Sequence, residues 1–175
     1  MSSPWWQQPC RALDAHAAAA AARRQAQLTK PSGSLGQLEG ISLRLAAQQG
    51  RERPSLERIW IAIFAGDHGV VAEGVSAYPQ AVTAQMLGNF VAGGAAINVF
   101  ARQNGLHLAI IDAGVAHDFG RRPGLIHAKV ASGTANYLEQ SAMTVEQCEL
   151  AILRGAEIVR NLVSNGCNVV AFGEM

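Results

Sequence analysis

The most constraining feature of this 175-residue sequence is the stretch from Arg58 to Pro79, which reads RIWIAIFAGDHGVVAEGVSAYP. It starts with a continuous apolar run, Ile59 to Ala65, and then changes abruptly to Gly66-Asp67-His68-Gly69. An apolar run without polar alternation is typical of a strand buried on both faces of a sheet. The carboxylate and imidazole that follow are therefore expected at the carboxyl end of this strand, where open α/β sheets bind ligands.

Two further apolar runs, Leu106 to Ile111 and Cys167 to Phe172, predict two more buried strands, and we expect a short strand within Ile126 to Ala131. Between the strands, the sequence predicts three helices. The first covers Gln80 to Phe90 with Pro79 in its first turn, and the second covers Ala95 to Asn104 with Gly105 as its C′ residue. The third begins with a Thr144/Gln147 capping box and ends near Ser164. Strands that alternate with helices predict right-handed crossovers. The expected fold is α/β, a Rossmann-like three-layer parallel sheet with helices on both faces.

Two helices are predicted before the first strand, Arg11 to Leu28 and Leu35 to Gln48. The first is rich in alanine, so it needs a close partner to bury its thin apolar face. At the other end of the sequence, no covering helix follows the last predicted strand. We therefore expect Val169, Val170 and Phe172 to lack part of their cover, and we infer a fragment or a fold completed by another chain.

Composition excludes several classes of partner. The net charge of +1 gives no electrostatic footprint for nucleic acid or an anionic membrane surface. No apolar stretch approaches the length of a membrane span. The three cysteines are odd in number and widely spaced, which indicates reduced thiols in a cytoplasmic protein and neither a disulfide framework nor a zinc site.

Asp67 and His68 have several interpretations on chemical grounds. They could bind a metal, since a DHG triplet after a strand occurs at metal sites of phosphohydrolases, or they could form an acid/base pair or position a substrate. In the alternative, both make only local hydrogen bonds at a turn. A metal would need more ligands, and no pair among the remaining candidates has a standard ligand spacing: His107, Asp112, His117, Asp118 and His127.

Other candidate sites each have a structural alternative. The segment Lys30 to Gly36 resembles a phosphate loop in composition but lacks the GxxxxGK[ST] order, and it equally fits a tight connector between helices. A second polar set, which fits either phosphate and ribose binding or a surface turn, comprises Lys129, Ser132, Gly133, Thr134 and Asn136. Tyr78, Met86 and Phe90 fit either stacking on a planar ligand or core packing. Glu174 either faces a cleft or is simply near the chain end.

Four ordered blocks together resemble the nicotinate-nucleotide–dimethylbenzimidazole phosphoribosyltransferase family. They are KPSGSLGQLE from Lys30, GDHGVVAEGVSAYPQAVTAQM from Gly66, IIDAGV from Ile110, and the final FGEM from Phe172. The blocks run from about Lys30 to the last residue, and they are similar to the N-terminal half of a chain about twice as long.

The resemblance implies an enzyme of cobalamin biosynthesis. It transfers phosphoribose from nicotinate mononucleotide to 5,6-dimethylbenzimidazole and yields α-ribazole 5′-phosphate and nicotinate. By family position, Tyr78 and Met86 line the slot for the aromatic acceptor, and Glu174 lies on the nucleotide side. Asp67 and His68 match a motif beside the cleft and act as positioning or structural groups.

The same resemblance sets further expectations. Residues 1–54 form an N-terminal helical segment of a small domain, and residues 55–175 form the N-terminal part of the α/β domain, apparently incomplete. The general-base glutamate is expected beyond Met175, so this chain alone should not be a competent catalyst. We expect no cofactor, no metal and a homodimer. The alternatives are a metal-dependent phosphohydrolase that uses Asp67 and His68, and a non-catalytic binding fragment.

Overall fold

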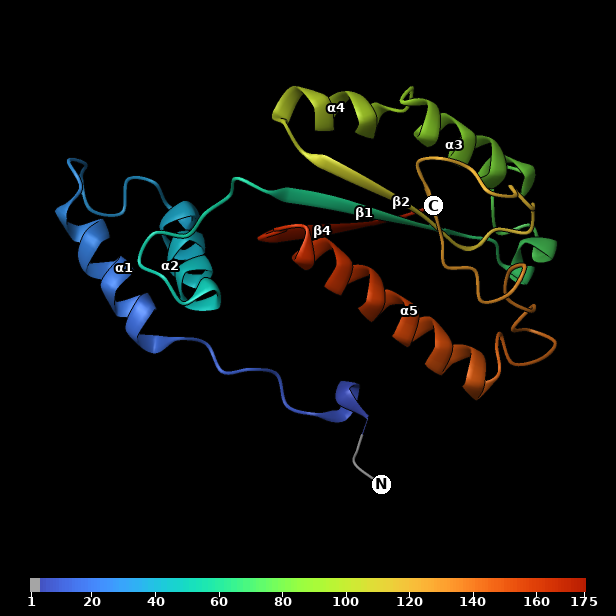
Figure 1. The fold of residues 1–175 in the computed structure, drawn as a ribbon, viewed down its shortest axis with the longest axis horizontal. Coiled ribbons are helices and arrows are strands. Elements are labelled where there is room, and N and C mark those ends of the chain that lie inside the picture. The colour runs from blue at the N-terminus through green and yellow to red at the C-terminus, as the bar shows by residue number, and fades with distance from the viewer. Residues whose placement is uncertain (1–3) are drawn as a thin grey trace. The chain divides into compact units, whose positions relative to one another are not determined.

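The computed structural model describes residues 4–175, and the chain divides into two compact units, Met1–Leu56 and Glu57–Met175. Figure 1 shows the helices of the first unit in blue and cyan, and the sheet and helices of the second unit from green to red. The five residues predicted to bind substrate, Asp67, His68, Tyr78, Met86 and Glu174, all belong to the second unit, whereas the Lys30–Gly36 segment belongs to the first.

The first unit is helical. It contains the short 3₁₀ helix η1 (Trp5–Gln7) and the helices α1 (Ala15–Gln27) and α2 (Gln37–Gln49), which pack against each other. The helix predicted from Arg11 starts at Ala15 because the Asp14 carboxylate accepts a hydrogen bond from the Ala17 N–H, at 2.9 Å, and caps the first turn. The buried side chains are all alanine, at positions 17, 21, 46 and 47. Because these side chains are small, α1 and α2 can approach each other closely, and the thin apolar face of α1 is enough for their packing.

The Lys30–Gly36 segment is the connector between α1 and α2. The Lys30 ammonium lies 2.6 Å from Glu39 Oε1 in α2, and the Leu35 N–H donates to the same oxygen at 3.2 Å. The hydrogen bond from Lys30 holds the pKa of Glu39 below its ordinary value of 4.5, and the Leu35 N–H lowers that pKa further. The lysine is thus already paired with a carboxylate of its own chain.

The second unit is built on a parallel four-stranded sheet of order β3-β2-β1-β4, which confirms the predicted α/β class. The strands are β1 (Ile59–Gly66), β2 (His107–Gly114), β3 (Leu125–His127) and β4 (Val169–Glu174). The short strand expected within 126–131 is only three residues long and begins one residue earlier. Phe172 on the edge strand β4 is 63% exposed.

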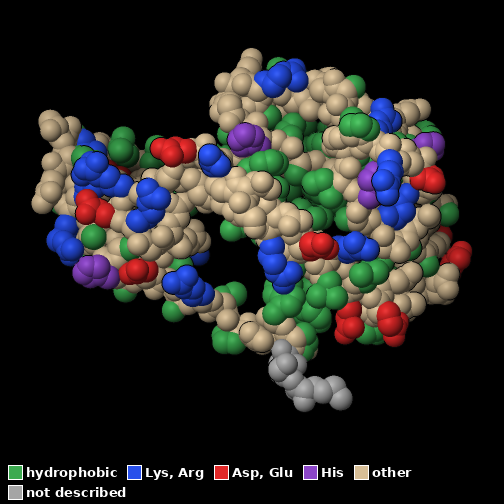
Figure 2. All heavy atoms as spheres, viewed as in Figure 1, with side chains coloured by type: hydrophobic (Ala, Val, Ile, Leu, Met, Phe, Trp, Pro, Cys, Tyr) green, Lys and Arg blue, Asp and Glu red, His purple; other side chains and the backbone are tan. Residues whose placement is uncertain are grey.

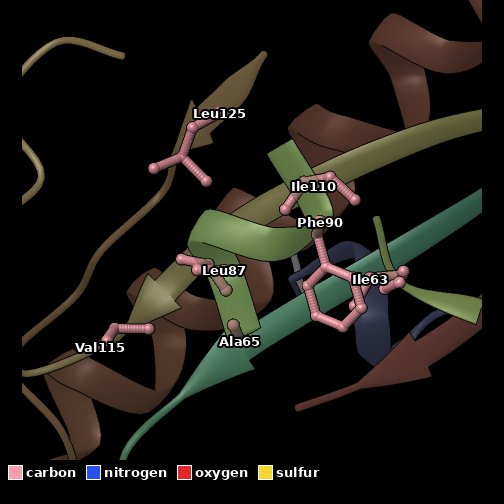
Figure 3. Packing of buried hydrophobic residues seen from close by; sticks show 8 residues of the cluster. Ile63, Ala65, Leu87, Phe90, Ile110, Val115 and Leu125 are labelled. Atoms are coloured by element: carbon pink, nitrogen blue, oxygen red, sulfur yellow. The ribbon is translucent and has the colours of Figure 1, made fainter. Parts of the chain in front are cut away.

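Helices cover both faces of the sheet, as predicted. One face carries α3 (Ala81–Ala92) and α4 (Ala96–Asn104), and the other carries α5 (Val145–Ser164) (Figure 1). Successive β1 side chains alternate between the two faces. Ile63 and Ala65 pack with the cluster under α3, which Figure 3 shows from close by, whereas Ala62 and Phe64 pack with the cluster under α5.

The helix-boundary signals were mostly correct. Thr144 and Gln147 form the predicted reciprocal capping box at the start of α5, and Gly105 follows α4 with a φ of 65°. Pro79 is the exception, because α3 begins at Ala81 with Gln80 as its N-cap. Pro79 thus precedes the helix and ends the segment that contains the 3₁₀ helix η2 (Gly69–Glu73).

Among residues 4–175, no helix combines the length and the apolar character that a membrane crossing requires. Figure 2 shows Lys and Arg side chains interspersed with Asp and Glu on the visible face, without one large patch of either sign.

We predict that Leu87→Ala destabilises the second unit. Leu87 is 1% exposed at the centre of the cluster between α3 and the sheet, so its truncation leaves a cavity. The free energy of unfolding, measured by urea denaturation, should fall by about 2–5 kcal/mol. Leu153→Ala on α5 is the control, because Leu153 is 45% exposed, and a comparable loss there would contradict the assignment of the core.

We also predict that Lys30→Met raises the pKa of Glu39. A folded-state pKa below the unfolded value stabilises the fold above the unfolded pKa, and this contribution is lost as the pH falls through the folded pKa. The variant should therefore lack the stabilisation of the fold that comes from the lowered pKa of Glu39, which wild type loses only when the pH falls below about 4.5. NMR titration of the Glu39 carboxyl carbon measures the effect, and an unchanged midpoint would rule out Lys30 as its main cause.

Candidate functional site

The carboxyl ends of β1, β2 and β4 lie side by side and bring three acidic residues to one edge of the sheet. In the register, Ala65 pairs with Asp112 of β2, and Phe64 pairs with Glu174 of β4, while Asp67 follows the end of β1. The chain passes from β1 to β2 over one face of the sheet and returns to β4 over the other. Such a switch in direction, with β1 between its two neighbours, creates the crevice in which open α/β sheets bind ligands.

Asp67 is buried, with 5% exposure, and is tied to two other segments of the chain. Its Oδ2 atom accepts a hydrogen bond from the Ala116 N–H at 2.7 Å. Its backbone N–H donates to the Gly114 carbonyl, and its carbonyl accepts from the Thr134 N–H, both at 3.0 Å. Asp67 therefore connects the end of β1 to the loop after β2 and to the loop that contains Thr134.

Asp112 organises the same loop from the end of β2. It is 1% exposed, and its Oδ1 atom accepts hydrogen bonds from the N–H groups of Gly114 and Val115, at 3.1 and 2.9 Å. Its other oxygen lies 3.3 Å from the Lys129 ammonium, which also donates to the His117 carbonyl at 2.9 Å. Sequence reasoning named Asp112 and Lys129 separately and missed their pairing. The only signal was an acidic residue at the end of an apolar run.

His68 and Gly69 fix the loop at Thr134 from the other side. His68 Nδ1 is hydrogen-bonded to Thr134 Oγ1 at 3.2 Å, and the Gly69 N–H donates to the Thr134 carbonyl at 2.9 Å. A Cβ atom at Gly69 would lie 2.4 Å from the Asn136 backbone nitrogen. Asn136 in turn donates to Glu73 Oε1 at 2.6 Å, so the segment after β1 and this loop are held in close contact.

One pocket, which we name the Glu174 pocket, opens at this edge on the α5 side and has a volume of about 290 Å³. Gly133 and Thr134 of the second polar set belong to its wall, whereas Lys129, Ser132 and Asn136 do not. The lining residues are Phe64, Ala65, Gly66, Asp67, His68, Ala113, Gly114, Val130, Ala131, Gly133, Thr134, Met143, Gln147, Ala151, Glu174 and Met175. The lining is mostly apolar, with Asp67, His68 and Glu174 as its titratable groups.

A second pocket of about 280 Å³, which we name the Tyr78 pocket, lies on the α3 side. It is lined by Gly66, Asp67, His68, Val70, Val71, Val75, Ser76, Tyr78, Pro79, Gln80, Val82, Thr83 and Met175. The two pockets share four residues, Gly66, Asp67, His68 and Met175. Met175 belongs to this wall because its N–H donates to the Phe64 carbonyl and its carbonyl accepts from the Gly66 N–H, both at 2.9 Å.

The structure brings four of the five proposed substrate-binding residues to these pockets. Asp67 and His68 line both, Glu174 lines one, and Tyr78 lines the other. Met86 lines neither pocket and packs against the hydrophobic cluster under α3. Phe90 is 8% exposed in the same cluster. Within the part of the chain that the structure describes, no three His, Cys, Asp or Glu side chains are grouped as metal ligands.

Residues 10–175 match the phosphoribosyltransferase family. Curated relatives named nicotinate-nucleotide–dimethylbenzimidazole phosphoribosyltransferase are 55% identical over 175 residues in Pseudomonas aeruginosa strain LESB58 and 63% identical over 147 residues in Dechloromonas aromatica strain RCB. These alignments cover 100% and 84% of this chain but 50% and 42% of the relatives. A crystal structure of the enzyme of that name from Thermus thermophilus superposes with a TM-score of 0.88 at 48% identity, over 93% of this chain and 49% of that chain.

The chain therefore spans about half the length of the curated relatives that it matches. The resemblance drawn from the four sequence blocks is confirmed, as is the fold class. The matches also support the transferase interpretation over a metal-dependent phosphohydrolase.

We predict that Gly69→Ala disrupts the close contact between the segment after β1 and the loop that contains Thr134. The added methyl group would collide with backbone atoms near Asn136, which cannot rotate away, so the unfolding free energy should fall by about 1–3 kcal/mol in urea denaturation. Gly88→Ala is the matched control, because Gly88 lies in α3 with nothing within 4 Å of its added Cβ. That variant should be neutral or more stable by up to about 1 kcal/mol. Equal effects at both positions would refute the close approach at Gly69.

Proposed function

This chain belongs to the phosphoribosyltransferase family, and from that membership we propose a function for the protein that contains it. It transfers phosphoribose from nicotinate mononucleotide to 5,6-dimethylbenzimidazole, and it forms α-ribazole 5′-phosphate and nicotinate for the lower ligand of cobalamin. The proposal takes its substrates from the names of the relatives and from the sequence resemblance.

The observation that carries the proposal is the pair of adjoining pockets with a common wall. A transfer between two substrates requires the acceptor atom and the reacting carbon to be held within contact distance of each other. Two hollows that share Gly66, Asp67, His68 and Met175 fit a donor on one side and an acceptor on the other.

We assign the nucleotide to the Glu174 pocket and the benzimidazole to the Tyr78 pocket. A flat aromatic base suits the largely apolar surface formed by Val71, Val75, Val82 and Tyr78, where it can pack against the phenol ring. On the other side, the Glu174 carboxylate adds negative charge near the sugar. Positive charge develops on the ribose as the bond to nicotinate weakens, so that carboxylate stabilises the transition state.

The reaction exchanges one C–N bond for another at the anomeric carbon. A benzimidazole nitrogen donates its lone pair to that carbon from the face opposite nicotinate, and the electron pair of the broken bond leaves with the nicotinate nitrogen. The attack inverts the configuration from β to α. A general base takes the benzimidazole proton. By resemblance that base is a glutamate beyond Met175, so none is assigned within residues 1–175.

Two finer features belong to the same proposal. We infer a cytoplasmic protein, which the three free cysteines support, because reduced thiols are typical of that compartment. We also infer a homodimer with acceptor sites near the subunit contact, and this rests on the resemblance alone.

The test is nicotinate release from nicotinate mononucleotide by the full-length protein, followed by chromatography with and without 5,6-dimethylbenzimidazole. Release that depends on the acceptor supports the proposal. Tight binding of dimethylbenzimidazole without release would favour a non-catalytic binding protein. Hydrolysis of phosphate esters that depends on added metal would instead favour the phosphohydrolase.

We predict that Tyr78→Ala weakens acceptor binding in the full-length protein. Loss of an aromatic contact of about 0.5–1.5 kcal/mol should raise the KM for dimethylbenzimidazole about 3- to 10-fold, with little change in the KM for the nucleotide. Tyr137→Ala is the control, since Tyr137 is 62% exposed and lines neither pocket. A larger effect on the nucleotide than on the acceptor would reverse the assignment of the pockets.

A further inference from the structure

Residues 114–117, which end β2 and begin the loop after it, are each hydrogen-bonded to the side chain of Asp67, Asp112 or Lys129. The Asp112 carboxylate accepts hydrogen bonds from the N–H groups of Gly114 and Val115. The Asp67 carboxylate accepts one from the Ala116 N–H, and the Lys129 ammonium donates one to the His117 carbonyl. Three successive backbone N–H groups thus point at two carboxylates. Such a run of N–H groups is an anion-binding arrangement, and here the anions are built into the chain.

We propose that Asp67 is a positioning residue of this site, which acts through the Ala116 N–H and not through its negative charge. The inference rests on the proposed function, because it concerns the pocket to which the nucleotide is assigned. Of the three side chains that hold the loop, Asp67 is the one that follows β1. Backbone pairing joins β1 and β2 as far as Gly114, and the bond from Asp67 to Ala116 extends this connection to the residues that follow β2.

The geometry indicates that the hydrogen bond to Ala116, and not the negative charge, is the property of Asp67 that matters. The Oδ2 atom of Asp67 lies 2.7 Å from a donor 49 residues away, and the backbone groups of Asp67 are already fixed by Gly114 and Thr134. Asp67 is 5% exposed, so its side chain has little freedom to adopt another rotamer. An amide oxygen at the same place can still accept from Ala116, whereas a carboxylate one methylene further out cannot keep the same geometry.

The loop position matters for the nucleotide because Ala113 and Gly114 line the Glu174 pocket and not the Tyr78 pocket. Gly114 is paired with the end of β1, but the chain that continues from it is held to Asp67 through Ala116. If that bond is lost, the chain after Gly114 can shift, and this side of the pocket loses part of its shape. The expected kinetic signature is therefore a higher KM for the nucleotide and a nearly constant KM for the acceptor.

The experiment compares Asp67→Asn, Asp67→Glu and Asp67→Ala in the full-length protein, with nicotinate mononucleotide and dimethylbenzimidazole as substrates. Asp67→Asn keeps an acceptor and should lose about fivefold in kcat/KM for the nucleotide, since a neutral hydrogen bond is weaker than a charged one. Asp67→Glu and Asp67→Ala should each lose about 10- to 100-fold. The control is Asp118→Asn, because Asp118 is exposed on the adjacent loop, lines neither pocket and should retain wild-type kinetics.

The opposite ranking would overturn the proposal. If Asp67→Glu retains activity and Asp67→Asn loses it, the charge of Asp67 is what matters. Wild-type kinetics in Asp67→Ala would also refute it. If Asp67→Ala does not fold, as judged by circular dichroism, the order of the Asn and Glu variants still decides.

Hydrogen exchange at the Ala116 amide gives a second readout that needs no activity. The amide should be protected in wild type and in Asp67→Asn and should exchange faster in Asp67→Glu. Absence of nicotinate release by wild type would remove the proposed function but leave this measurement intact. An Ala116 amide that exchanges equally fast in wild type and both variants would remove the positioning role, whatever the reaction.

Discussion

Parallel pairing of β1 with β2 on one side and β4 on the other is the constraint on which the site depends. Because the three strands run in the same direction, their carboxyl ends meet at one edge. Their register brings Asp112 and Glu174 opposite neighbouring residues of β1. The covering helices lie on opposite faces, so the hollows at this edge are separated by the end of β1 itself. The two-pocket arrangement is thus a direct result of strand order and crossover direction.

Buried acidic side chains make this edge rigid in a particular way. Asp67 and Asp112 do not face open solvent, and the contacts described above assign their oxygen atoms to backbone N–H groups and to Lys129. Charged acceptors of this kind form stronger hydrogen bonds than neutral ones, and the low exposure strengthens them further. The N–H groups of residues 114–116 are therefore already taken by carboxylates of the chain and are not available to bind a phosphate group.

The sequence was sufficient for the strands and for most helix boundaries. Apolar runs such as Ile59 to Ala65, the Thr144/Gln147 capping box and Gly105 are local signals, and local signals can be read without tertiary structure. The surroundings of Asp67 were not predictable in this way, since its partner Ala116 is 49 residues away and depends on the register of the sheet. Met86 shows a different limit. Helical spacing fits a ligand slot and a core equally well, and only the packing of α3 on the sheet separates the two.

The wall between the pockets has a consequence for altering specificity. Met175 is held by backbone hydrogen bonds to Phe64 and Gly66, and the residue lines both hollows. A substitution there changes the surface of both hollows at once, so under the proposed function donor and acceptor preferences cannot be adjusted independently at this position. Under the same proposal, redesign for a bulkier or more polar acceptor is better directed at Val75 or Thr83, which line only the Tyr78 pocket.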